Sequence, residues 1–178
     1  VYSDDLGIFS STGRTVWNPA DGFTSVTDAL DEFGNPTPMD MVENVNGGIF
    51  IGASGNELQD NGIVSGGIPE FGFSWQGLLE GEVYDLALYV YREDVISQAT
   101  TLRVTHAAGV DTLATTKNTT FSPPGEEGGD YVLLLGVQPT EITPGVWGFV
   151  VDNLNDEGAI LGLQIRGPVP AAAGVPRR

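Results

Sequence analysis

Apolar and polar residues alternate with a period of two along much of this chain, which is the pattern of β-strands. The clearest case is residues 82–106, where two such stretches are joined by a polar connection at 92–99. The first stretch, around Leu86 and Leu88, is apolar on nearly both faces, as in a central strand. The second, around Leu102 and Val104, keeps one polar face. We expect the connection between them to be a hairpin or a corner loop.

Similar stretches recur through the rest of the chain. Residues 71–76 place aromatic side chains on one face, residues 131–137 form a continuous apolar run that predicts a buried strand, and residues 146–151 and 159–165 alternate again. The Asn46-Gly47-Gly48 sequence predicts a hairpin between strands at 39–45 and 49–51. Residues 53–69 predict a long surface loop, and no window holds a sustained helical period.

Glycine and proline divide these stretches, with 25 Gly and 11 Pro among 178 residues. A chain of this length fits one domain, and many short strands between turns are typical of sandwiches and barrels. We therefore predict an all-β fold, a single antiparallel β-sandwich of jelly-roll type with about ten strands. This domain spans residues 1–167, and a Pro/Ala-rich tail follows at 168–178.

The net charge of the chain limits the kinds of partner that it can bind. A formal charge of −17, with Lys117 as the only lysine, argues against nucleic acid and against anionic membrane surfaces, and we expect no membrane span. Copies of such a chain repel one another unless salt or cations intervene. Cysteine is absent, so disulfides and thiol chemistry are excluded. The start at Val1 and the lack of a leader segment lead us to expect a mature, processed product.

Catalytic chemistry finds little support in the residue pattern. His106 is the only histidine, and it shares the inward register of Leu102 and Val104, so it fits a structural or rim role better than a catalytic one. Neither a G-x-S-x-G nor an H-E-x-x-H motif is present. A carboxylate pair could serve a glycosidase, but among 24 acidic residues no pair is distinguished. We predict a protein that is not an enzyme.

Calcium is the cofactor that the sequence best accommodates. Two Gly-containing loops concentrate oxygen ligands of the kind this ion needs. Neither loop has the spacing of an EF-hand, and both are equally readable as solvated acidic loops. The candidate metal ligands are Asp152, Asn153, Asn155, Asp156, Glu157, Glu126, Glu127 and Asp130.

Two further features concern partners. Trp17, beside a turn, is the best candidate for an exposed sugar-stacking residue, which would suit an extracellular polysaccharide. The tail contains Pro168, Pro170 and Pro176, which favour an extended conformation. It could act as an assembly arm whose Arg177 and Arg178 meet the acidic surface of a neighbouring subunit, or it could fold back on its own domain.

Three segments carry a family resemblance: YDLALYVYRED, TTLRVTHAAG and GAILGLQIRGPVP. With these the chain resembles, over residues 71–170, the extracellular β-sandwich domains that precede PEP-CTERM sorting signals in environmental bacteria. The tail departs from that pattern, because Ala171 follows Pro170 where the family signal has Glu-Pro. The resemblance implies a secreted or surface-associated matrix protein and supplies no catalytic residues.

Together these observations lead to two functional hypotheses. The first is an extracellular or cell-surface structural subunit that self-assembles, as a homo-oligomer or polymer, into a filament, tube or matrix layer by strand or arm exchange. The second is a carbohydrate-binding module of an exported bacterial protein. Binding to a soluble glycan, and its loss in Trp17→Ala, would separate the second hypothesis from the first.

Overall fold

The computed structural model of the 178-residue chain describes residues 2–3, 15–16, 26–31, 33–43, 48–51, 61–64, 71–90, 100–114, 127, 131–154, 159–160 and 162–168. These residues form fourteen strands and no helix. Every pairing between strands is antiparallel. The predicted all-β, antiparallel class is therefore confirmed. The predicted number of about ten strands is not confirmed. Three of the fourteen strands are only two residues long.

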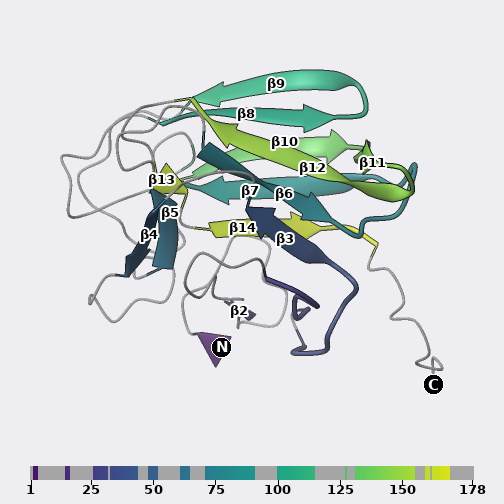
Figure 1. The fold of residues 1–178 in the computed structure, drawn as a ribbon, viewed down its shortest axis with the longest axis horizontal. Helices are drawn as coiled ribbons and strands as arrows, with labels where there is room; N and C mark the ends of the chain where they lie inside the picture. Colours follow the sequence, from purple (N-terminus) through teal and green to yellow (C-terminus); the bar gives the residue numbers. More distant parts are fainter. Residues whose placement is uncertain are drawn as a thin grey trace.

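Two sheets form the body of the molecule (Figure 1). The larger runs in the order β3 (Asp40–Glu43), β6 (Phe71–Gln76), β12 (Val146–Asn153), β8 (Thr101–His106) and β9 (Gly109–Ala114), with β11 (Thr140–Thr143) paired to β12. The smaller runs β10 (Tyr131–Val137), β7 (Tyr84–Tyr89) and β14 (Gly162–Arg166). Two minor sheets join β13 (Ala159–Ile160), β5 (Asn61–Val64) and β4 (Gly48–Ile51), and β1 (Tyr2–Ser3) with β2 (Thr15–Val16).

The two main sheets share one hydrophobic core, which gives a sandwich-like arrangement. The rings of Tyr84 on β7 and Phe149 on β12 meet edge to face, with centroids 6.1 Å apart, a contact worth about 1 kcal/mol beyond the area it buries. The buried members of this core are Phe73, Leu78, Tyr84, Leu86, Leu88, Val90, Leu102, Val104, Val132, Val137, Phe149, Val151 and Ile160.

The stretch at 82–106 behaves as its pattern predicts. β7 is buried on both faces and lies at the centre of its sheet, whereas β8 buries Leu102, Val104 and His106 and leaves the alternate residues partly exposed. The two strands belong to different sheets, so the chain between them crosses from one sheet to the other. Of the two predicted connections, a hairpin or a corner loop, the hairpin is therefore wrong, because β7 and β8 do not pair with each other.

Glycine allows the two central strands of the larger sheet to approach closely. A Cβ atom at Gly148 on β12 would overlap the carbonyl oxygen of Trp75 on β6, and one at Gly72 would overlap that of Val151. Because both obstacles are backbone atoms of a paired strand, side-chain movement could not relieve the overlap. These two positions therefore require glycine for a steric reason that the alternation pattern did not reveal.

Three local predictions are wrong, each because of tertiary context. β3 pairs with β6 and β4 with β5, so the predicted hairpin at residues 46–48 does not form; in this pairing Met41 lies opposite Trp75. β5 lies inside the predicted loop at 53–69. β10 is an edge strand rather than a buried one, and Leu135 is 57% exposed, because a bulge between Leu134 and Val137 turns the strand outward at Gly136, whose φ is +69°.

Tyr84 holds the end of the described chain. Its hydroxyl accepts a hydrogen bond from the Leu79 amide at 3.1 Å and donates one to the Pro168 carbonyl at 3.0 Å, while its ring packs against Gly167. Burial raises the pKa of the Tyr84 hydroxyl above its ordinary value of 10.0, so the group remains a donor. The first residue of the predicted tail, Pro168, is thus fixed to the sandwich, while residues 169–178 lie outside the described residues.

Candidate functional site

A β-sandwich offers its edge strands for association, because their outward N–H and C=O groups need partners. Natural proteins cover such edges, bend them with bulges or place charges on them. The strand order of the two main sheets ends in four edges, β3, β9, β10 and β14, and β11, which pairs only with β12 and with an irregular register, adds a short further edge to the larger sheet. How each edge is treated therefore indicates where a partner could bind.

The outer side of β3 is covered by the chain itself. Val26 exchanges two backbone hydrogen bonds with Met41, at 2.9 and 2.8 Å, and the Ala29 amide donates to the Met39 carbonyl at 2.8 Å. Between these contacts the Asp28 amide donates to the Asp40 carboxylate at 3.0 Å, with Asp28 in the left-handed region at φ +52°. This edge of the larger sheet is therefore covered from Met39 to Met41.

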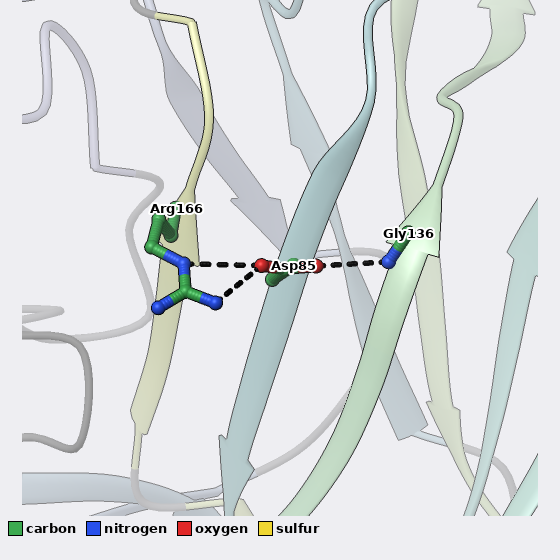
Figure 2. Close-up of polar contacts among 3 residues, drawn as sticks. All are labelled: Asp85, Gly136 and Arg166. Carbon is green, nitrogen blue, oxygen red and sulfur yellow. Dashed lines mark hydrogen bonds and ion pairs between the residues drawn. The ribbon is translucent and has the colours of Figure 1, made fainter.

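Both edges of the smaller sheet are tied to its central strand by one carboxylate (Figure 2). One oxygen of Asp85 on β7 accepts the Gly136 amide of the β10 bulge at 2.8 Å. The other accepts Nε and Nη2 of Arg166 on β14, at 3.0 and 2.6 Å. These bonds, those of Arg166 first and that of Gly136 next, hold the pKa of Asp85 below its ordinary value of 3.8. A bulge thus marks one edge and a charged residue ends the other, two of the features that discourage strand addition.

β9 is neither covered nor bent, and the one charged residue on it is Asp111. Within the part of the chain that the structure describes, β9 pairs only with β8, in a regular six-residue ladder without a bulge. Figure 1 shows it as the upper rim of the molecule. It contains neither proline nor a cationic residue, and Val110 is 55% exposed. β9 therefore presents an open edge, and we regard it as the candidate functional site.

The register of the hairpin shows which groups of β9 face outward. His106 and Gly109 are paired across a two-residue turn, and the pair that closes such a turn exchanges both of its backbone hydrogen bonds. Bonded and non-bonded pairs then alternate along an antiparallel ladder. It follows that Val110, Thr112 and Ala114 direct their N–H and C=O groups away from β8. These are the groups that an added strand would bind.

The only charged side chain of β9 is already paired. Asp111 lies diagonally across from His106, and its Oδ2 is 3.1 Å from His106 Nε2. Nδ1 of His106 accepts the Ala108 amide at 3.3 Å, so in the neutral ring the proton resides on Nε2 and points to Asp111. The Ala107 amide donates to the Gln138 carbonyl at 2.9 Å and ties the same turn to the segment that follows β10. These contacts place the sole histidine in a hydrogen-bonded group at the tip of the β8–β9 hairpin.

Three of the eight predicted metal ligands lie within the described residues. Asp152 binds Nε and Nη2 of Arg103 at 3.1 and 2.9 Å, directly across from it on β8. Asn153, the next residue, is fully buried, and neighbouring residues of a strand point to opposite faces, so the structure does not bring these two side chains together. Glu127 is exposed. The remaining candidates lie outside the described residues: Asn155, Asp156, Glu157, Glu126 and Asp130. The described ranges hold no group of three His, Asp or Glu side chains placed to bind a metal ion.

The other predicted contact residues, Trp17, Arg177 and Arg178, also lie outside the described residues. Phe73 and Trp75 on β6 pack on the shared core. The indole nitrogen of Trp75 is buried without a hydrogen-bond partner. Within the described residues, no helix is long and apolar enough to cross a membrane.

Sequence reasoning did not identify the Asp85–Arg166 pair, the Tyr84 contacts or the open β9 edge. The first two join residues 81 and 84 positions apart, and no spacing rule links them. The place of the β8–β9 hairpin at the edge of the sheet depends on strand order, which the sequence pattern does not give. Comparison with known protein families, with characterised proteins and with solved structures finds no match to this chain.

Proposed function

We propose that this chain is a secreted, non-enzymatic structural subunit that associates with copies of itself through an open sheet edge and builds an extracellular filament, tube or matrix layer. The observation that carries the proposal is the contrast among the four edges. β3 is covered by residues 26–29, β10 is bulged and β14 ends on Arg166, whereas β9 is regular and uncovered among the described residues. The jelly-roll connectivity and the extracellular location are parts of the same proposal.

The high negative charge sets the conditions for association. A chain of charge −17 repels its copies at long range, and salt shortens that repulsion to about 8 Å at 0.15 M. Divalent cations would act more strongly, and the acidic loops make calcium the ion to test. We therefore expect association to increase from low to physiological salt and to increase further with millimolar calcium.

Solution mass by light scattering, with negative-stain images, tests the proposal. The wild-type chain is compared with Thr112→Pro, which removes an outward N–H from β9 and leaves the bonds to β8 intact. Thr112→Ala is the matched control because it shortens the same side chain and keeps the N–H. We expect the wild type and Thr112→Ala to form oligomers and Thr112→Pro to remain monomeric. A monomeric wild type in chelator, in salt and in calcium would refute the proposal.

A further inference from the structure

We infer that the partner of β9 is β9 of a second copy, paired antiparallel about a two-fold axis that passes between the two copies of Thr112. This inference rests on the proposed function and adds the partner strand and its register. Strand addition at a sheet edge normally gains affinity from main-chain bonds and specificity from alternate side chains. Both criteria can be applied to the six residues of β9.

The symmetric registers open to this strand are centred on one of its four interior residues, Val110, Asp111, Thr112 or Leu113. Opposite residues in an antiparallel pair lie on the same face of the sheet, so a two-fold axis normal to the sheet must pass between a residue and its own copy. The Thr112 register sets Val110 opposite Ala114, so all three outward-facing residues of each copy form bonded pairs. Within β9, the Asp111 register pairs only Val110 with Thr112 in this way, and the Leu113 register pairs only Thr112 with Ala114. The Val110 register pairs only Val110 with its own copy.

Charge favours the same choice. The Asp111 register would place two carboxylates directly opposite each other in a non-bonded pair, where Cα atoms are about 4.5 Å apart, and like charges in that position are destabilising. The Thr112 register places each Asp111 opposite Leu113, while Thr112 faces Thr112, a favourable cross-strand pair. Each Asp111 also keeps its contact with His106 of its own chain, at 3.1 Å. Among the symmetric registers, the one centred on Thr112 therefore makes the most main-chain bonds without placing like charges opposite each other.

The C-terminal segment is a weaker occupant of this edge. Residues 169–178 contain Pro170 and Pro176, and each proline removes a donor that a ladder would use. β9 contains no proline, and each of its outward residues supplies both a donor and an acceptor. A second β9 therefore completes the edge better than the arm does.

The chain has no cysteine, so a single introduced cysteine reports on the geometry of the interface. Thr112→Cys would face its own copy at a Cα separation of about 5.5 Å, within the range of a disulfide. Val110→Cys, on the same exposed face, would lie about 13 Å from its copy along the strands, beyond that range. Under mild oxidation we expect Thr112→Cys to form a covalent dimer and Val110→Cys to remain monomeric on a non-reducing gel. Mixing Val110→Cys with Ala114→Cys should restore a cross-linked dimer, because these positions face each other.

The outcomes separate this inference from the proposed function. Oligomers in light scattering without a Thr112→Cys dimer, or with efficient cross-linking through Asp111→Cys instead, would overturn the register and leave self-assembly in place. A cross-link from Thr112→Cys to a cysteine placed in residues 171–175 would assign the edge to the arm. A wild-type chain that stays monomeric refutes both proposals. Urea unfolding of each variant confirms that the sandwich is intact.

Discussion

Asp85→Asn is expected to loosen both edges of the smaller sheet at once. The wild-type carboxylate accepts three hydrogen bonds, one from the Gly136 amide and two from the Arg166 guanidinium. An asparagine can still accept from Gly136 but loses its ionic contact with Arg166. Charge-assisted bonds contribute about 1.5 to 3 kcal/mol when shielded, but exposed pairs contribute only about 0.2 to 1 kcal/mol. Because the Arg166 side chain is 60% exposed, we expect a loss of about 1 kcal/mol in the free energy of unfolding.

Urea unfolding at pH 7, followed by tryptophan fluorescence, measures this loss. Glu80→Gln is the matched control, because it removes an equal charge from an exposed carboxylate. It therefore accounts for the general relief of repulsion in a chain of charge −17. If Asp85→Asn and Glu80→Gln change the unfolding free energy equally, the reasoning about the Asp85 contacts is wrong.

The effect also has a pH dependence of known sign. The pKa of Asp85 is lower in the folded protein than its ordinary value of 3.8, so the folded state favours the ionised form. The stabilisation is fully present above pH 3.8 and is lost as the pH falls through the folded pKa. The difference between wild type and Asp85→Asn should therefore be constant from neutral pH to about pH 5 and shrink as the pH falls below 3.8. A difference that grows with acidification would contradict the assignment.

Two other substitutions test the fold. Gly148→Ala is expected to cost about 3 kcal/mol or more, because its methyl group would overlap the Trp75 carbonyl; Gly81→Ala, in open space at φ +73°, should cost only about 1 kcal/mol, and equal losses in urea unfolding would contradict the steric argument. Tyr84→Phe removes the bonds to Leu79 and Pro168 and is expected to cost about 1 to 2 kcal/mol. The same change should accelerate hydrogen exchange at the Leu79 amide, whereas unaltered exchange there would show that the hydroxyl does not protect it.

Alternation allowed the strands to be predicted where one face is buried. β8 buries every second residue as expected, and the inward position of His106 followed from that register. The pattern cannot specify which strand lies beside which, since any strand with an apolar face can pair with several others. The hairpin expected at residues 46–48 failed for this reason, because β3 pairs with β6 through Met41 and Trp75.

The candidate sites show a similar limit. Asp152 was selected for its acidic neighbours in the sequence, but its bonded partner in the structure is Arg103, 49 positions away. The open edge at β9 could not be identified from the sequence, because the sequence does not give the order of the strands in the sheet. A local cluster of charges says what could bind, whereas the arrangement of strands decides which groups remain available.

Because the outer side of β3 is covered, an added strand can pair with the larger sheet at only one of its two terminal strands, β9. A sheet open at both terminal strands could extend from copy to copy without limit, as in a fibril, but here residues 26–29 cover β3, so of the two terminal strands only β9 can accept a neighbour. Joining two copies at β9 would leave a closed β3 at each end of a doubled sheet, and growth by strand pairing in that direction would stop. Any larger structure would then be built from such pairs through contacts of another kind, so its repeating unit would be the dimer.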